Sequence, residues 1–577
     1  MRRFIGLLLL TLSTTVLLGS TVPAGRAISQ PSPDEPQPVS GGAIFAPGEI
    51  VVKVKDGAPA DTIASLNRNH NARVEEKMPN SRVNLVDLPD DLTVAEAVRA
   101  YEASPGVAYA EPNYKLYAAG TVACSQSDPL LPSDPHPCIP DDPSFSKMYD
   151  MNNRGQYGGT YDADVDAPEA WKVETGSPGT IVAVIDTGVD IHHPDLNDNI
   201  WTNPGETGLD AAGNDKATNG VDDDNNGYVD DVHGWDFYND DASVFDPKQK
   251  DAHGTHVAGT IAAEGDNDRG VTGVSWQARI MPLKFIGPYN DGTIFDAAEA
   301  LDYAVRMGAK ISNNSYGGWY DSCGGCYAQT LQDAIARADR ADHLYVAAAM
   351  NGGSDFVGDD TDANPIYPSS YDNPNILTVA ATNNDDELTS FSNYGLRTVD
   401  LAAPGKDILS TWPGNRYAYG LGTSMATPHV TGVAALIKSK YPQLTDTQIK
   451  DRILANVDKK PGLQGKLVSG GRLNAAKALG ADTAPVIDGV SPHGRASVTP
   501  TITATVHDDE TDLSQSQIQL YIDGNQKLDF SYDQATDTLT YVSGKLANRR
   551  HKIQVVADDG QGLQEARTWT FWAGRRR

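Results

Sequence analysis

The 577-residue chain lacks a surplus of basic residues. It has 46 Lys and Arg against 77 Asp and Glu, which gives a formal net charge of -31. A nucleic-acid-binding surface needs clustered Lys and Arg to contact phosphates, so we exclude nucleic acid as a partner. An acidic surface is compatible with calcium binding, but equally with an ordinary well-solvated protein.

Long apolar runs are also scarce. The one at the N-terminus, Phe4 to Leu18, follows two arginines and precedes small residues up to Ala27, the layout of a secretory signal peptide. It is shorter than the about 20 apolar residues that span a membrane, and no later segment reaches that length. We therefore expect a secreted, extracellular protein with a signal peptide at residues 1–27 and no integral membrane segment after its removal. A retained N-terminal anchor is the alternative.

Cysteine is rare, with four residues in the whole chain. Cys124 and Cys138 flank a Pro-rich segment, and Cys323 and Cys326 bracket two glycines. An even number in an exported chain favours a disulfide within each near pair. The Cys-x-x-Cys could instead be a redox pair or half of a zinc site, but no second such motif or suitably spaced His pair accompanies it.

Pattern changes divide the rest of the chain. Residues 28–47 are Pro-rich and read as a linker, and residues 118–144, rich in Pro and Asp, read as a second one. Between them, residues 48–117 predict a small α+β unit with the order βαββαβ. Its expected strands are 49–54, 72–76, 82–88 and 107–110, and its expected helices are 61–69 and 93–101.

Two further units follow. Over residues 145–482, apolar runs at 181–185, 278–283, 344–347 and 376–380 alternate with helical stretches, which indicates an α/β fold with a doubly wound parallel sheet. Over residues 485–577, short alternating strands such as 501–506 and 551–556 predict an Ig-like β-sandwich.

Three motifs carry chemistry. Asp186 follows the first buried strand in Ile-Asp-Thr-Gly, His253 opens His-Gly-Thr-His-Val-Ala-Gly-Thr, and Ser424 lies in Gly-Thr-Ser-Met-Ala-Thr-Pro-His. Asp-Thr-Gly also occurs in aspartic proteases, but those need a second copy or a dimer partner, and the motif is not repeated here in a matching all-β context. A serine hydroxyl is unreactive unless a neighbour takes its proton, and a histidine oriented by a carboxylate does so near neutral pH.

In their order, Asp then His then Ser, the motifs resemble the subtilisin family of serine proteases (subtilases, peptidase S8). The resemblance covers residues 145–479. It implies a serine endopeptidase, acting on proteins or peptides through an acyl-enzyme, with Ser424 as nucleophile, His253 as base and Asp186 orienting the imidazole. Asn351 matches the family's oxyanion-binding Asn, but the usual Ala-Ala-Gly-Asn is here Ala-Ala-Met-Asn. Met350 is therefore expected to narrow or reshape the primary specificity pocket.

The resemblance extends to the flanking segments. The sequence from Gly106 to Tyr114 is similar to the end of subtilase prodomains, which implies a zymogen whose prodomain is an intramolecular inhibitor; an ordinary ferredoxin-like domain is the alternative. Maturation is expected between Tyr114 and Pro143, since exposed loops of this kind concentrate proteolysis. Two stretches resemble the strands that flank substrate: residues 287–292, and the run Ser315, Tyr316, Gly317 and Gly318.

Structural calcium is the expected ion, and two segments could bind it. Residues 221–231 place oxygen side chains at alternate positions, as in the start of an EF-hand loop, but His233 stands where an EF-hand has its bidentate Glu. A plain acidic turn is the alternative. A second site is implied by the family resemblance alone. The candidate ligands of the first site are Asp222, Asp224, Asn226 and Asp230. Those of the second site are Asp195 and Asn267.

Two other interpretations compete with catalysis by Asp186, His253 and Ser424. His256 lies three residues after His253 and could suggest a metal pair, but without a zincin Glu we expect it to be structural, as we do for His429. The whole chain could also be a non-enzymatic binding protein that keeps a protease-like scaffold and binds through its Ig-like unit. Loss of a triad or oxyanion residue would favour that interpretation, and none is missing.

Overall fold

The computed structural model describes residues 45–574, apart from residues 80, 90–91, 119–120, 125–138, 250, 319–326, 481–484, 509–511 and 559–563. The predicted signal peptide and three of the four cysteines lie outside the described residues, as does the side chain of Cys124, so the disulfide predictions stay open. In the part of the chain that is described, no helix combines the length and the apolar character that crossing a membrane requires.

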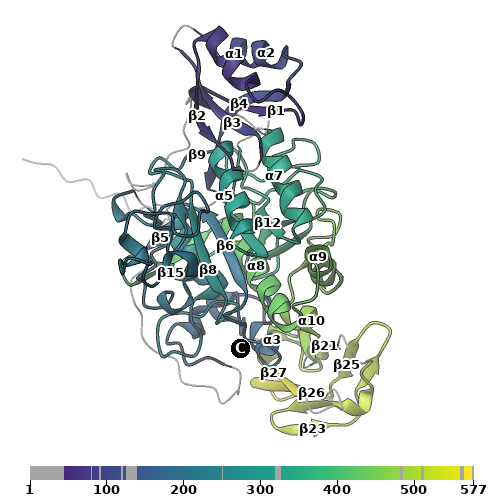
Figure 1. Cartoon of the computed structure of the whole chain (residues 1–577). Helices are drawn as coiled ribbons and strands as arrows, with labels where there is room; N and C mark the ends of the chain where they lie inside the picture. The colour runs from purple at the N-terminus through teal and green to yellow at the C-terminus, as the bar shows by residue number, and fades with distance from the viewer. Residues whose placement is uncertain are drawn as a thin grey trace, which may run out of the picture. The chain divides into compact units, whose positions relative to one another are not determined.

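The N-terminal unit has two helices and contributes four antiparallel strands to a six-stranded sheet (Figure 1). The predicted order βαββαβ is confirmed. Two bounds differ: the first strand begins at Phe45, inside the predicted linker, and the last continues to Ala118. The elements are β1 (Phe45–Val54), α1 (Thr62–His70), β2 (Arg73–Lys77), β3 (Val83–Asp87), α2 (Val94–Glu102) and β4 (Val107–Ala118).

The central unit is built on a nine-stranded sheet with the order β17-β18-β14-β13-β12-β10-β6-β8-β7. Every neighbouring pair except β17 with β18 is parallel. The middle strands are buried on both faces, which is why their sequences are continuous apolar runs. The strands are β6 (Ile181–Asp186), β7 (Trp235–Asp236), β8 (Arg279–Lys284), β10 (Ile311–Asn314), β12 (Leu344–Ala348), β13 (Ile376–Thr382), β14 (Leu401–Pro404), β17 (Asp458–Lys459) and β18 (Gly471–Arg472).

Helices cover both faces of this sheet, so the doubly wound prediction is confirmed (Figure 1). On one face of the sheet, the strands share an apolar core with α3, α4, α8, α9 and α10. On the other face, they share a second core with α5 and α7. Short strands β5, β9, β11, β15 and β16 lie outside the main sheet. Their bounds and those of the helices are β5 (Thr121–Cys124), β9 (Gly292–Thr293), β11 (Tyr316–Gly317), β15 (Ile408–Trp412), β16 (Arg416–Leu421), α3 (Ala167–Trp171), α4 (His253–Ala262), α5 (Ile294–Arg306), α7 (Gln329–Arg340), α8 (Thr423–Lys440), α9 (Asp446–Ala455) and α10 (Ala475–Leu479).

The C-terminal unit is rich in strands. Its two sheets, β19-β21-β25-β24 and β20-β27-β26-β22-β23, contribute side chains to one shared apolar core. The elements are β19 (Val486–Ser491), β20 (Gly494–Ala496), β21 (Thr501–His507), β22 (Ile518–Ile522), β23 (Asn525–Lys527), β24 (Ser531–Asp533), β25 (Thr538–Val542), β26 (Arg550–Asp558) and β27 (Gln564–Ala573).

Candidate active site

Asp186 and His253 meet at the carboxyl end of β6. The Asp186 carboxylate is fully buried, and its Oδ1 accepts from the Thr187 backbone N–H at 2.7 Å and contacts Nδ1 of His253 at 2.8 Å. His253 is the first residue of α4. A Cβ on the following Gly254 would lie 2.4 Å from the carbonyl oxygen of Gly188, so only glycine lets α4 come this close to the strand end. The contact fixes Nδ1 as the protonated nitrogen and leaves Nε2 as the basic one.

Ser424 stands in the first turn of α8. Gly422, at the N-cap, has a φ of 143°, which L side chains rarely adopt, and the helix starts at the next residue. The Ser424 hydroxyl donates to the backbone carbonyl of Ser315 at 3.1 Å, and the Ser315 hydroxyl donates to the Ser424 carbonyl at 3.2 Å. Nε2 of His253 has no hydrogen-bond partner among the described residues, so proton transfer to it requires the Ser424 side chain to turn.

Asn351 lies beside the same helix start. Its Oδ1 accepts from the Thr423 backbone N–H at 3.0 Å. Because a backbone N–H can only donate, this contact assigns the oxygen of the amide to that side. The donor end, Nδ2, is therefore directed away from Thr423. Asn351 is 3% exposed, so a donor at this position acts in surroundings with little water.

The last strand of the N-terminal unit enters the site as an extended chain. β4 pairs antiparallel with β9, Leu116 lying opposite Gly292, and with β11, Tyr117 lying opposite Gly317. Of the predicted peptide-binding residues, Tyr316 and Gly317 are thus paired with the chain itself. Ser315 and Gly318 lie outside this ladder: the first holds the Ser424 hydroxyl, and Gly318 donates its N–H to Tyr367.

Side chains reinforce this contact at two helix starts. Both carboxylate oxygens of Glu111 accept backbone N–H groups at the N-terminus of α7, from Gln329 and Thr330, at 2.9 Å each. Oδ1 of Asn113 accepts from the Phe295 N–H at the start of α5. Helix starts present N–H groups that lack partners within the helix, so acceptors from the N-terminal unit satisfy them.

A buried lysine supports the strand end, and sequence reasoning missed it. Lys284 and Asp251 are almost inaccessible to solvent, and their side chains pair at 2.8 Å. The Lys284 ammonium also donates to the carbonyl oxygens of Thr187 and Ile286. This pair links β8 to the loop that begins α4, and so to the position of His253.

In the acidic loop after β6, one predicted ligand, Asp224, lies with two carboxylates that the sequence did not single out. Carboxylate oxygens of Glu206, Asp224 and Asp231 lie within 4.8 Å of one another. Glu206 and Asp231 are 0% exposed, burial raises the pKa of both carboxyls, and Oε2 of Glu206 has no hydrogen-bond partner among the described residues. These residues fit a hard cation with oxygen ligands.

The other predicted loop ligands take different roles. Asp222 accepts the Asn226 and Gly227 N–H groups, and Asp230 accepts the Gly220 N–H, so Asp230 lies outside the carboxylate group. Nδ2 of Asn226 donates to Asp231 at 2.8 Å.

Asp195 and Asn267 are brought together as predicted, with Asn267 Nδ2 donating to Asp195 Oδ1 at 3.0 Å. A third residue, Asp142, is near enough to Asp195 to be affected by its charge. Asp142 is 4% exposed, its Oδ1 is without a partner among the described atoms, and burial raises its pKa to about 7. The neighbouring Asp195 carboxylate also raises it. Asp142 was missed because it falls in the segment taken for a linker.

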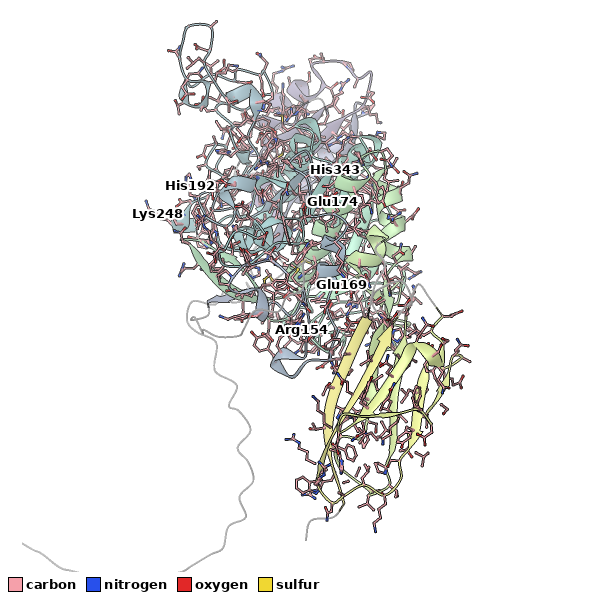
Figure 2. The ribbon with its side chains drawn as sticks, turned by 90° about the horizontal axis from the view of Figure 1, so that it is seen from below. Arg154, Glu169, Glu174, His192, Lys248 and His343 are labelled. Carbon is pink, nitrogen blue, oxygen red and sulfur yellow. The ribbon has the colours of Figure 1, made fainter. Side chains whose placement is uncertain are left out.

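The two histidines that the sequence predicts to be structural, His256 and His429, are fully buried. Nε2 of His256 contacts the carbonyl oxygens of Ile408 and Ala418 at 3.1 Å each, and burial lowers the pKa of this imidazole to about 3. His429 pairs with Asp150 at 2.9 Å. His192 is exposed at the edge of the molecule (Figure 2).

Comparisons with known proteins point to one protease family. The Subtilase family profile matches residues 177–475, and the profile of the fervidolysin N-terminal prodomain matches residues 31–113. Thermophilic serine proteinase from Bacillus sp. (strain AK1) is 33% identical over 437 residues, covering 75% of this chain and 88% of that protein. Thermitase from Thermoactinomyces vulgaris is 35% identical over 340 residues, which cover 59% of this chain and 99% of that protein.

Among solved structures, fervidolysin from Fervidobacterium pennivorans, a keratinolytic enzyme related to subtilisin, superposes with a TM-score of 0.58 at 22% identity. The match covers 92% of this chain and 76% of that one and supports the fold. With the family profile matching more than half of the chain, the conclusion is direct: the chain belongs to the subtilase family of serine endopeptidases and carries an N-terminal prodomain.

Proposed function

We propose that this chain is a secreted endopeptidase, made as a zymogen, that cleaves proteins through the triad Asp186, His253 and Ser424. The observation that carries the proposal is the 2.8 Å contact between His253 Nδ1 and the buried Asp186 carboxylate, which leaves Nε2 as a base. Secretion rests on the signal-peptide pattern of residues 1–27. The binding-protein alternative is less well supported, because every residue that the chemistry needs is present.

The reaction follows from these groups. When Ser424 Oγ attacks the peptide carbonyl carbon, Nε2 of His253 takes the hydroxyl proton, and Asp186 stabilises the imidazolium without being protonated. Collapse of the tetrahedral intermediate breaks the C–N bond, and the same proton passes to the leaving amine. A water molecule then attacks the acyl-enzyme by the reverse proton path, which releases the acid and restores Ser424.

The oxyanion of that intermediate is expected to bind Nδ2 of Asn351 and the Ser424 backbone N–H. The partial positive charge at the start of α8 favours the same negative charge. Asn351 is thus proposed to act in the transition state rather than in substrate binding.

Replacing Asn351 by leucine is expected to lower kcat by about 10²–10³-fold with little change in KM, because a transition-state donor is lost. Asn351→Asp is the matched variant: it keeps an acceptor for the Thr423 N–H but replaces the donor. Both variants should lose turnover to a similar degree in steady-state assays. Retention of full kcat by Asn351→Asp would contradict the assignment.

The N-terminal unit is proposed to inhibit the enzyme until it is removed. β4 fills the backbone positions of β9 and β11 that an extended substrate would use. β4 ends at Ala118, which pairs with β11. The next strand, β5, begins at Thr121 and pairs with β16, the strand that precedes Ser424 in the sequence. The bond 119–120, which joins them, is therefore the proposed maturation site.

Calcium is proposed as a structural ion at two places. One would be held by Glu206, Asp224 and Asp231, and the other by Asp142, Asp195 and Asn267. The first set offers three carboxylates. The second offers two carboxylates and the Asn267 amide, whose Nδ2 donates to Asp195 here and which would have to turn to present its oxygen to the ion. Each set contains a buried carboxylate oxygen without a partner among the described residues.

A saturating chelator is expected to lower the thermal midpoint of the mature enzyme, because an ion that binds only the folded state stabilises it by about 2.7 kcal/mol at 100 times its Kd. Glu206→Gln should reduce the difference between the thermal midpoints with calcium and with chelator. Asp230→Asn, which changes a residue outside the carboxylate group, should leave that difference unchanged. Equal midpoints with calcium and with chelator would remove the proposal.

The C-terminal unit is proposed to be the Ig-like β-sandwich that the sequence predicts, supported by two sheets around one core.

The test of the proposed function is hydrolysis of denatured casein by the purified chain, together with a serine-directed phosphonate. The phosphonate should abolish hydrolysis and add its mass to the peptide that contains Ser424. Hydrolysis that survives complete labelling, or labelling elsewhere, would overturn the assignment.

A further inference from the structure

Met350 stands directly before Asn351 and is 1% exposed. Its φ is +67°, in the left-handed region that glycine adopts freely and other residues avoid. A methionine in this conformation needs compensating contacts from its side chain. Those contacts are with Ala348 and Ile366, with which Met350 forms a small apolar cluster.

The Met350 side chain also lies against the strand that receives the paired chain. A Cβ placed on Gly317 would come within 3.0 Å of both Cγ and Sδ of Met350, and within 3.1 Å of the Tyr367 carbonyl oxygen. The thioether therefore reaches the surface of β11 at a residue that pairs with β4.

This location is close to the nucleophile from two sides. Ser315, which precedes β11, accepts the Ser424 hydroxyl, and Asn351, which follows Met350, contacts Thr423. A substrate carbonyl held between Ser424 and Asn351 would bring the side chain of the residue before the cleaved bond to these two segments. Met350 takes up room there that a glycine would leave open.

We propose that Met350 restricts the residue before the cleaved bond to alanine, glycine or serine. This inference rests on the proposed endopeptidase function and deepens it by naming the substrate class. The thioether occupies the volume that a phenylalanine or leucine side chain would need, and displacing it would break its contacts with Ile366 and β11. Large side chains are thus excluded by packing rather than by charge.

The sequence at the proposed maturation site agrees with the restriction. The residues that connect the ladder on β11 to the ladder on β16 are Ala118, Ala119 and Gly120. If maturation cuts within this connection, as proposed above, the residue before the cleaved bond is alanine or glycine. The precursor would therefore present to Ser424 a side chain of the size that Met350 allows.

The full-length chain and its variants Met350→Gly and Met350→Leu are each produced and allowed to process themselves. Their hydrolysis of Ala-Ala-Pro-X p-nitroanilides is then compared, where X is alanine or phenylalanine. The original chain should favour alanine in kcat/KM by about 10²-fold. Met350→Gly suits the positive φ and should lower this preference at least 10-fold. Met350→Leu fills a similar volume and should keep it. Thermal midpoints show that each variant is folded.

A second measurement is the identity of the casein fragments. Those from the original chain should end mainly in alanine, glycine or serine, and those from Met350→Gly should add ends with large residues. Equal cleavage of both peptides by the original chain, or an unchanged preference in Met350→Gly, would overturn the inference while the endopeptidase assignment stands. Absence of all phosphonate-sensitive hydrolysis would instead overturn the proposed function and the inference with it.

Discussion

Replacing Ser424 by alanine is expected to lower casein turnover by roughly 10⁶-fold and to leave the precursor uncut. The size follows from the way the triad acts as a unit: without the hydroxyl, the base at His253 has no proton to accept and no acyl-enzyme forms. The remaining rate would come from the donor at Asn351 and from substrate binding. Maturation stops for the same reason, because the bond 119–120 is proposed to be cleaved by this serine.

The measurement is casein hydrolysis and the intact mass of the purified chain. Ser439→Ala is the matched control, since Ser439 lies on the same helix and its hydroxyl donates to Ala435 at 2.8 Å. It should mature and should retain activity within a few-fold of the original chain. A processed, active Ser424→Ala chain would show that another group is the nucleophile.

The parallel sheet and the motif residues could be predicted from sequence because both are local patterns. The run Ile181–Ile185 predicts a strand buried on both faces, and Asp186 follows it directly, so the carboxylate falls at the strand end where ligands bind. The length of β4 could not be predicted in this way. Its last residues form a strand only because β9 and β11 supply partners from distant parts of the chain.

The acidic sites show the same limit. Alternating acidic residues at 222–226 predict a cation loop, but Glu206 and Asp231 complete the carboxylate group through folding, and Glu206 lies in no recognisable motif. Asp142, whose pKa the Asp195 carboxylate raises, comes from a segment whose Pro-rich composition predicts a linker. Lys284 directly follows the predicted strand 278–283 and lies in no recognised motif. Only its burial beside Asp251 marks it as a support of the active site.

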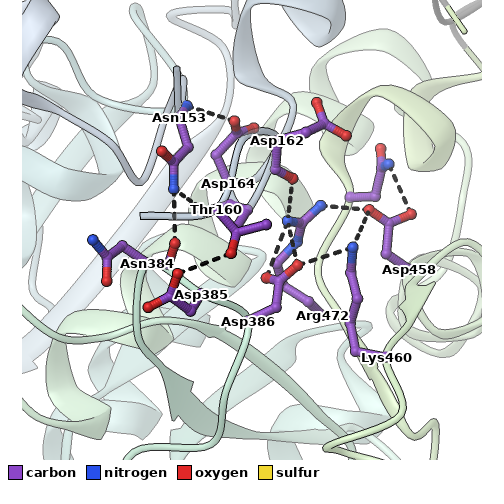
Figure 3. A network of polar contacts seen from close by, with 12 residues as sticks. Asn153, Thr160, Asp162, Asp164, Asn384, Asp385, Asp386, Asp458, Lys460 and Arg472 are labelled. Carbon is purple, nitrogen blue, oxygen red and sulfur yellow. Dashed lines mark hydrogen bonds and ion pairs between the residues drawn. The ribbon is translucent and has the colours of Figure 1, made fainter. Parts of the chain in front are cut away.

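Arg472 on β18 is the most deeply buried cation of a polar cluster that joins several segments (Figure 3). Its guanidinium is 0% exposed, pairs with Asp166 at 3.3 Å and with Asp386 at 3.1 Å, and also pairs with Asp458. Burial acts to raise the pKa of the Asp458 carboxyl, but Arg472 and Lys477 outweigh it and hold that pKa below its usual range. The stability that this ionised carboxylate contributes is therefore present at neutral pH and lost as the pH falls through the acid range.

Arg472→Met is expected to destabilise the central unit by about 3–5 kcal/mol, since it removes the positive partner and leaves buried carboxylates behind. Lys460 and Lys477 still reach Asp386 and Asp458, but Asp166 loses its pair. Unfolding is followed by the thermal midpoint in the Ser424→Ala background, which prevents autolysis, and a fall of roughly 5 °C or more is expected.

Arg397→Met is the matched control for this prediction. Arg397 pairs with Asp362 at 3.4 Å, but its side chain is 76% exposed, so its removal should cost at most about 1 kcal/mol. The contrast depends on burial, because both variants remove one guanidinium that pairs with aspartate. Equal midpoints for the two variants would mean that the carboxylates around Arg472 are neutralised by protons or reached by water once the cation is gone, and that the cluster does not hold β18 against α3.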